Sequence, residues 1–297
     1  MATAQFGRVI TAMITPFTED GAVDYESAVA LAKHLVAHGS EGLLVGGTTG
    51  EGATMTAEEK LKLYTLIVDA VGKRGEGKKV PVMGNIGTIS TADTIAFGNK
   101  AKETGIDCAL VIVPFYVKPN QEGMYQHFTA VAKGVDLPLV LYNVPGRTGV
   151  SIQPETIKRI VDECPNVVGI KDATGSWDQV TKEKALLPED FMIYSGDDAF
   201  TLPVLLAGGV GIISVSAHVI GDDMLAMVDA FEKGDLAKAR ELHLKMYEIN
   251  KGMFFTASPT PVKTATNLVG QPGGHFRLPM VEPTEAEKAK VRQMLEN

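Results

Sequence analysis

Short apolar runs separated by longer amphipathic segments recur along the first three-quarters of the chain. The runs are rich in β-branched residues and predict eight buried strands. They are Val9–Thr15, Gly42–Val45, Val80–Gly84, Ala109–Val113, Pro138–Tyr142, Val167–Lys171, Phe191–Ser195 and Gly211–Val215. Nearly continuous apolar character is typical of parallel strands that are covered on both faces.

The segments between these runs carry a helical period. In Asp24–His38 the apolar residues fall on one stripe, and Gly39 follows as a stop signal. Thr56 with Glu59 forms a capping-box pattern that predicts the start of another helix. Ser90 predicts a further helix start, and Pro154 predicts the first turn of a helix that runs to about Glu163.

Strict alternation of strand and helix predicts a parallel sheet covered by helices. Eight such units fit a (β/α)8 barrel, which takes about 250 residues. The segment Asp223–Glu232 is expected to be the eighth helix, with Gly234 as its stop. A doubly wound open sheet is the alternative, but no Gly-x-Gly-x-x-Gly pattern joins a first strand to a helix.

Beyond residue 234 the strands cease and helical patterns follow one another. They are Asp235–Asn250, a stretch near Pro261–Val269, and Pro283–Glu296, the last opening with a Thr284 and Glu287 capping box. We therefore predict two parts, a barrel over residues 1–234 and a C-terminal helical extension over 235–297 that packs on the barrel.

Composition narrows the class of protein. The 297 residues are 45% hydrophobic and 22% charged, as expected for a globular chain, and the net charge is -8. An acidic balance argues against nucleic acid and against an anionic membrane surface as partners. The two cysteines cannot build a disulfide framework. The N-terminal residues lack a basic and apolar leader pattern, and no apolar run approaches about 18 residues, so a cytoplasmic location is expected.

The run Val167–Asp172 ends in a lysine. Strand alternation would place Val167, Gly169 and Lys171 on one face, so that the ammonium points among apolar neighbours. Desolvation there would lower the pKa of Lys171 and make it a nucleophile toward carbonyl groups. The alternative is a structural ion pair with Asp172 or another acid, which is the commoner role of a single lysine.

Other strand ends carry polar residues as well. The second strand leads into the glycine- and threonine-rich segment Gly46–Gly52, and the fourth into Pro114–Tyr116. The fifth leads into Tyr142–Gly149, where Arg147 could hold a carboxylate in a bidentate manner. Each feature alone fits a tight turn, a core ring or a surface arginine. Because reactive groups of barrels gather at the carboxyl ends of strands, their coincidence favours an active site. The six histidines lack the pairing with acids that a zinc site needs.

Together these residues resemble the dihydrodipicolinate synthase family, within the N-acetylneuraminate lyase superfamily of class I aldolases. The resemblance runs from about Gly7 to the C-terminal helices. It rests on the segments Gly47–Glu51, Pro114–Tyr116, Gln121–Phe128, Tyr142–Thr148 and Gly169–Asp172.

The resemblance implies that Lys171 forms a Schiff base with pyruvate, which then condenses with L-aspartate 4-semialdehyde in lysine and diaminopimelate biosynthesis. It further implies a homo-oligomer, commonly a tetramer built as a dimer of dimers, and no metal or organic cofactor. The resemblance also implies a role for each site residue. Tyr142, Thr48 and Tyr116 would relay protons, with Tyr116 reaching in from a neighbouring subunit. Thr49 would hold the pyruvate carboxylate, Arg147 would bind the semialdehyde carboxylate, and Ile213 would line the pyruvate pocket.

Four positions depart from lysine-inhibited members of the family. Gly52, Ala57, Lys60 and Phe115 replace a serine, two histidines and a tyrosine, so we expect weak or absent inhibition by lysine. The alternatives are an N-acetylneuraminate lyase or a 2-keto-3-deoxy sugar acid aldolase, which usually lack the Gly146 and Arg147 pair. A non-catalytic binding barrel and a metal-dependent aldolase are further alternatives; a chelator would distinguish the latter.

Overall fold

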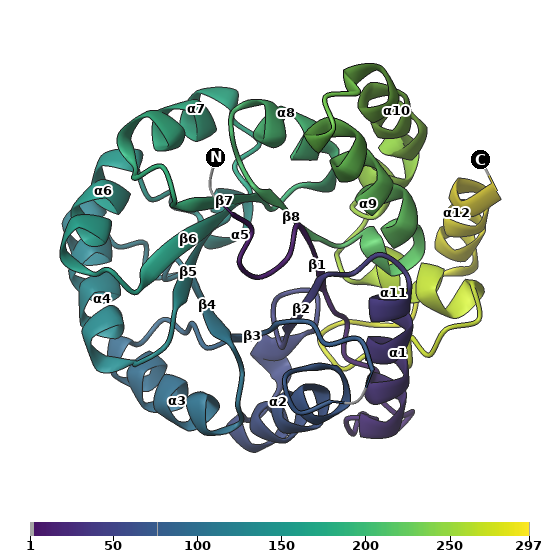
Figure 1. The fold of residues 1–297 in the computed structure, drawn as a ribbon. Helices are drawn as coiled ribbons and strands as arrows, with labels where there is room; N and C mark the ends of the chain where they lie inside the picture. The colour runs from purple at the N-terminus through teal and green to yellow at the C-terminus, as the bar shows by residue number, and fades with distance from the viewer. Residues whose placement is uncertain (1–2, 76, 297) are drawn as a thin grey trace.

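A closed barrel of eight parallel strands forms the centre of the molecule (Figure 1). The computed structural model describes residues 3–75 and 77–296. Strand β8 closes on β1, where Ile10 pairs with Ile213. The strands are β1 Val9–Ala12, β2 Gly42–Val45, β3 Val82–Asn85, β4 Cys108–Ile112, β5 Leu139–Asn143, β6 Val167–Asp172, β7 Met192–Ser195 and β8 Gly211–Ser214. The predicted (β/α)8 fold and all eight predicted strands are confirmed, although β1 ends at Ala12 rather than Thr15.

A ring of helices covers the outside of the barrel (Figure 1). Thr56 and Glu59 form the predicted capping box of α2, since Glu59 N donates to Thr56 Oγ1 at 3.1 Å and Thr56 N donates to Glu59 Oε2 at 2.9 Å. The helices of the ring are α1 Tyr25–Ala37, α2 Ala57–Val71, α3 Thr91–Glu103, α4 Gln121–Gly134, α6 Pro154–Glu163, α7 Trp177–Leu186, α8 Thr201–Leu206 and α9 Ala217–Glu232. Three short helical turns follow strands: η1 Gly52–Thr54, α5 Pro145–Thr148 and η2 Asp198–Phe200.

Helix α9 begins earlier than the predicted Asp223. Its first turn, from Ala217, is separated from the rest by a kink at Ile220, whose φ of -132° and ψ of 30° are not helical. The kink interrupts the helical period, which is why the sequence pattern indicated only the second part. The helix ends as predicted before Gly234, which adopts a left-handed φ of 79°.

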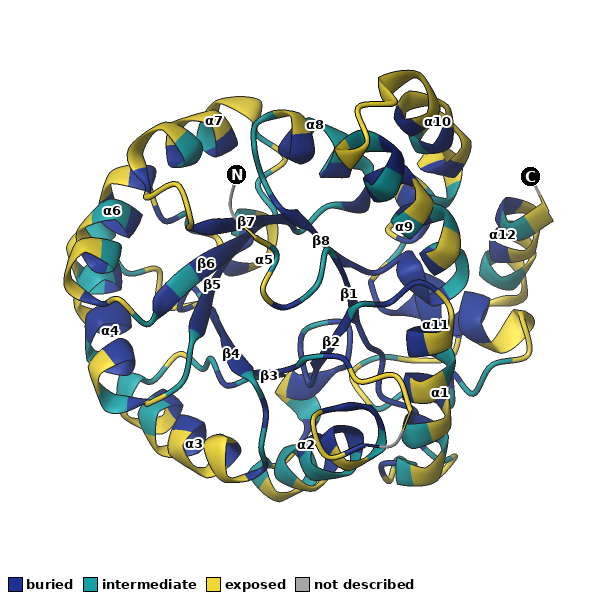
Figure 2. Cartoon of the chain, viewed as in Figure 1, coloured by how far each residue is buried: buried dark blue, intermediate teal, exposed yellow. Residues whose placement is uncertain are grey.

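Side chains of the strands alternate between the inside and the outside of the barrel. One apolar core fills the barrel, and two apolar clusters that make up the outer core lie between the strands and the surrounding helices, so the strands are buried on both faces (Figure 2). Side chains inside the barrel include Ile10, Leu44, Met83, Leu110, Val140, Tyr142, Met192, Tyr194 and Ile213.

The strand that carries Lys171 contains an irregularity that the sequence did not indicate. Leu139 pairs with Val167 but Val140 pairs with Gly169, so Val168 is an extra residue in β6. Val167 therefore packs in the outer core, while Val168 packs against the inner core. The prediction that Val167 shares a face with Lys171 was wrong, because the bulge shifts the alternation by one residue.

Three helices follow the barrel ring: α10 Leu236–Gly252, α11 Thr260–Leu268 and α12 Glu285–Glu296. Helix α10 lies against α9, and α12 lies against α11 and α10. The predicted helical C-terminal region is confirmed, while the division at residue 234 stays a prediction. Met1 and Asn297, which bound the two predicted parts, lie outside the described residues. No helix within the described ranges is long and apolar enough to cross a membrane.

Candidate active site

Lys171 lies at the carboxyl end of β6, inside the barrel. Its Cα pairs with that of Tyr142 on β5 and that of Tyr194 on β7, so a tyrosine lies next to the lysine on each neighbouring strand. Lys171 is buried, and its Nζ lies 4.6 Å from the centre of the Tyr142 ring. The structure thus confirms the predicted burial of Lys171.

Burial lowers the pKa of Lys171 from 10.5 to about 8. The negative charge of Asp198 acts in the opposite direction, and the positive charge of Arg147 lowers the pKa further. A lysine with this pKa is uncharged in about one molecule in ten at pH 7, and only the uncharged amine attacks a carbonyl carbon. The site therefore supplies a nucleophilic amine near neutral pH.

Tyr142 connects Lys171 to the loop that follows β2. Burial raises the pKa of the Tyr142 phenol, whereas the charge of Arg147 and a hydrogen bond with Thr48 lower it. Thr48 is half-buried, and the neighbouring Thr49 is buried. The structure therefore brings Lys171, Tyr142 and Thr48 together, with hydroxyl groups placed where protons could be exchanged.

The acid next to Lys171 in the sequence is not its partner. Asp172 accepts hydrogen bonds from Thr174 N at 3.0 Å and from Thr174 Oγ1 at 2.5 Å. Asp172 and Glu183 of α7 also influence each other's pKa, and burial raises the pKa of both carboxyl groups. Asp172 thus belongs to a buried network behind the strand, and the alternative of an ion pair with Lys171 is wrong for this acid.

The remaining predicted site residues lie at different depths. Ile213 is fully buried inside the barrel on β8. Arg147 is exposed on α5, close enough to influence the pKa of both Tyr142 and Lys171. Tyr116 is 86% exposed in the loop after β4, with a left-handed φ of 67° that is uncommon for a non-glycine residue. The fold of one chain therefore does not bring Tyr116 into the group formed by the others.

Asp198 is a site residue to which the sequence assigned no role. It is fully buried on η2 after β7, and its carboxylate accepts hydrogen bonds from Ser214 Oγ and from Val215 N, the latter at 3.1 Å. Burial raises its pKa to about 6, so it carries a negative charge near Lys171 at neutral pH. Its position shortly after the end of the seventh strand is the sequence feature that could have marked Asp198 as a candidate site residue.

A (β/α)8 barrel whose buried lysine has a lowered pKa and lies against a tyrosine ring is typical of class I aldolases, which are lyases. A sequence model described as the Dihydrodipicolinate synthetase family matches residues 5–297. The chain belongs to this family.

Several relatives and solved structures are similar to this chain over nearly its full length. A 4-hydroxy-tetrahydrodipicolinate synthase of Heliobacterium modesticaldum is 48% identical over 293 residues, covering 99% of this chain and 96% of the relative. One of Symbiobacterium thermophilum is 48% identical over 290 residues, covering 98% and 97%. A crystal structure of a dihydrodipicolinate synthase from Bacillus anthracis has a TM-score of 0.94 at 42% identity and covers 100% of this chain and 99% of that one.

Proposed function

We propose that this chain is a 4-hydroxy-tetrahydrodipicolinate synthase, which condenses pyruvate with L-aspartate 4-semialdehyde in lysine and diaminopimelate biosynthesis. The observation that carries the proposal is Lys171, buried inside the barrel with a pKa of about 8 and with its Nζ over the Tyr142 ring. Full-length relatives at 48% identity that are named for this activity support the choice of substrates.

The first half of the reaction activates pyruvate. The uncharged Nζ of Lys171 attacks the C2 carbonyl carbon, and loss of water leaves a protonated imine. A proton then leaves the methyl group, and its electron pair moves into the iminium to give an enamine. The iminium serves as the electron sink, so this step requires no metal ion or organic cofactor.

The second half forms the new carbon–carbon bond. The enamine carbon attacks the aldehyde carbon of the semialdehyde, and the resulting alkoxide takes up a proton. The amino group of the semialdehyde then attacks the imine carbon, and Lys171 leaves as an amine while the ring closes. We propose that Tyr142 and Thr48 deliver and remove these protons, and the hydrogen bond between them supports this role.

Three residues are proposed to hold the substrates. Thr49, on the glycine-rich loop after β2, would hold the pyruvate carboxylate through its hydroxyl and the backbone N–H groups around it. Ile213 would line the pyruvate pocket from β8. Arg147 is exposed on α5, where its guanidinium is free to bind the semialdehyde carboxylate in a bidentate manner.

Tyr116 is proposed to act in the site of a neighbouring subunit, so that the active form is at least a dimer and, by family resemblance, a tetramer. Its 86% exposure is the supporting observation, together with the 59% exposure of Val117 beside it. A large aromatic side chain held outward by a left-handed backbone is available for a contact with another copy of the chain. The cytoplasmic location expected from the sequence stays a prediction.

The Schiff base can be tested by borohydride reduction of the protein with pyruvate, followed by mass mapping of peptides. We expect one reduced pyruvyl adduct, on Lys171. Lys263 is an internal control, because it is also fully buried but is paired with Glu51. An adduct on another lysine, or none, would overturn the proposal. Turnover of aspartate semialdehyde, compared with sugar aldehydes, then tests the acceptor.

The role of Tyr116 can be tested by mixing two inactive variants, Lys171→Ala and Tyr116→Phe, under conditions that exchange subunits. If Tyr116 acts across an interface, mixed dimers contain one intact site, and about a quarter of the wild-type activity returns. If Tyr116 acts within its own chain, mixing restores nothing. Tyr116→Phe should still form the pyruvyl adduct, since Lys171 is unchanged in that variant.

A further inference from the structure

The loop that carries Thr48 and Thr49 is attached to the C-terminal segment by a buried ion pair. Glu51, two residues after Thr49 in this loop, accepts a hydrogen bond from Lys263 Nζ of α11 at 2.6 Å. The side chains of Lys263 and Glu51 are only 0% and 2% exposed. Lys263 also donates to the carbonyl oxygen of His275, which follows α11 in the chain. The pair thus joins residues that are 212 positions apart in the sequence.

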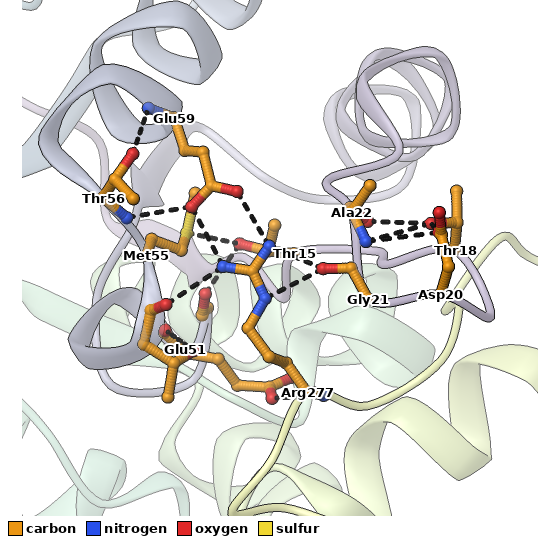
Figure 3. A network of polar contacts seen from close by, with 12 residues as sticks. Thr15, Thr18, Asp20, Gly21, Ala22, Glu51, Met55, Thr56, Glu59 and Arg277 are labelled. Carbon is orange, nitrogen blue, oxygen red and sulfur yellow. Dashed lines mark hydrogen bonds and ion pairs between the residues drawn. The ribbon is translucent and has the colours of Figure 1, made fainter.

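Arg277 forms a second attachment between the same two regions (Figure 3). Its guanidinium donates to Thr54 O at 3.0 Å, and to both carboxylate oxygens of Glu59 at 2.9 and 2.8 Å. It also donates to Gly21 O, and its backbone N–H lies 3.4 Å from Glu51 Oε2. The C-terminal segment therefore contacts both ends of the stretch from Glu51 to Glu59.

Aromatic rings complete the contact. Lys263 Nζ lies 4.5 Å from the centre of the Phe17 ring, and the Arg277 guanidinium lies 4.4 Å from the same centre. The backbone of Phe17 also bridges to His275. Cations over an aromatic face gain electrostatic stabilisation, particularly where water is excluded. Lys263 and Arg277 are thus both held against Phe17 of the barrel.

The position of Glu51 is transmitted to the two threonines through a tight backbone. Glu51 N donates to Thr48 O at 3.1 Å, and Gly52 N donates to Gly47 O at 3.0 Å. Glu51 itself adopts a left-handed φ of 52°, which is strained for a residue with a side chain. A Cβ on Gly52 would lie 1.9 Å from Gly46 O, so the backbone of this turn packs closely on itself.

We propose that Glu51, Lys263 and Arg277 are positioning residues, through which the C-terminal helical segment sets the geometry of the Thr48 and Thr49 loop for the pyruvate carboxylate. The inference rests on the proposed function. A buried ion pair contributes little net stability compared with apolar residues of the same size, but it requires one relative placement of its two partners. Here that placement fixes a loop beside Lys171, whereas Arg147 lies on α5, outside these contacts.

The test compares Lys263→Met with the double variant Glu51→Gln/Lys263→Met. Removing the ammonium alone leaves a buried carboxylate unpaired, so we expect Lys263→Met to be strongly destabilised. The double variant buries no charge, and its thermal stability should return close to that of the wild type. Its KM for pyruvate should nevertheless rise about tenfold or more, while its KM for the semialdehyde stays within about twofold of the wild type.

Comparing the pyruvate KM with the thermal stability of the double variant distinguishes a positioning role from a role in stability. A role in stability alone predicts that the pyruvate KM recovers together with the thermal stability of the double variant, and that result would overturn the inference. Arg277→Met acts on the same loop without leaving a fully buried charge, and it should raise the same KM even where Lys263→Met does not fold. Lys288→Met, which removes an exposed pair with Glu285 on α12, is the matched control and should change neither KM.

Failure of the inference can be told apart from failure of the proposed function. If wild-type protein gives no pyruvyl adduct on Lys171, the proposed function fails. If the adduct forms in the wild type and the double variant keeps a wild-type KM for pyruvate, only the inference about the C-terminal segment fails.

Discussion

The low pKa of Lys171 leads to a quantitative prediction about its reactivity. Burial is the main cause of the shift from 10.5 to about 8, so the amine should gain reactivity through a pH range in which ordinary lysines remain charged. The perturbation is a change of pH from 6 to 11 in the absence of substrate. The quantity to be measured is the pH at which half of the Lys171 side chains are uncharged.

The expected difference is large. At pH 7 a lysine with a pKa of 10.5 is uncharged in about one molecule in 3000, whereas one with a pKa of 8 is uncharged in about one in ten. Lys171 should therefore exceed a typical lysine by about 300-fold in the population of its reactive form. The rate of Schiff-base formation at low pyruvate concentration should rise about tenfold per pH unit below 8 and level off above it.

Competitive labelling provides the assay. A trace of isotopic acetic anhydride acetylates uncharged amines, and peptide mass spectrometry gives the extent of labelling of each lysine against pH. Lys133 is a useful comparison in the same sample, because its hydrogen bond with Glu163 raises its pKa. Denaturation and full acetylation with a second isotope correct for differences between peptides.

A labelling midpoint for Lys171 near or above 10 would refute the argument that burial activates it. The variant Asp198→Asn tests the electrostatic part of the same argument. Because the negative charge of Asp198 raises the pKa of Lys171, removing that charge should move the midpoint below its wild-type value. An upward shift would contradict the assigned direction.

Three further predictions concern the site and its surroundings. Tyr142→Phe should lower kcat by about 10²- to 10⁴-fold while the pyruvyl adduct still forms. Tyr194→Phe, on the other side of Lys171, should change kcat far less. Equal losses of kcat in steady-state assays would contradict a specific role for Tyr142. Gly52→Ala places a Cβ 1.9 Å from Gly46 O and should abolish most activity. Gly123→Ala should not, because its Cβ would lie 3.3 Å from the side chain of Pro119. Burial raises the pKa of Glu183, so the native state holds a proton that the unfolded state loses above pH 4.5. The free energy of unfolding should therefore fall as pH rises above about 4.5, and Glu183→Gln should flatten this fall in denaturant titrations.

Much of the fold follows from local pattern. Eight apolar runs alternating with amphipathic segments predicted the barrel, because a strand buried on both faces leaves few polar positions in the sequence. The capping box of Thr56 and Glu59 could also be predicted from the sequence, because both partners lie within one helical turn. The candidate site was also accessible in part, because parallel strands bring their carboxyl ends to one rim and the order of residues reveals those ends.

The tertiary structure decided what depends on pairing between distant segments. The bulge at Val168 follows from the register between β5 and β6, which leaves no local signal, and it determines that Val167 faces the outer core. The contact of Lys263 with Glu51 is likewise absent from any local pattern, because 212 residues separate the two charges. The sequence alone determined which groups are available and at which strand ends. Only the closed barrel and its C-terminal helices decided which of them are desolvated and paired, and desolvation is the main cause of the lowered pKa of Lys171.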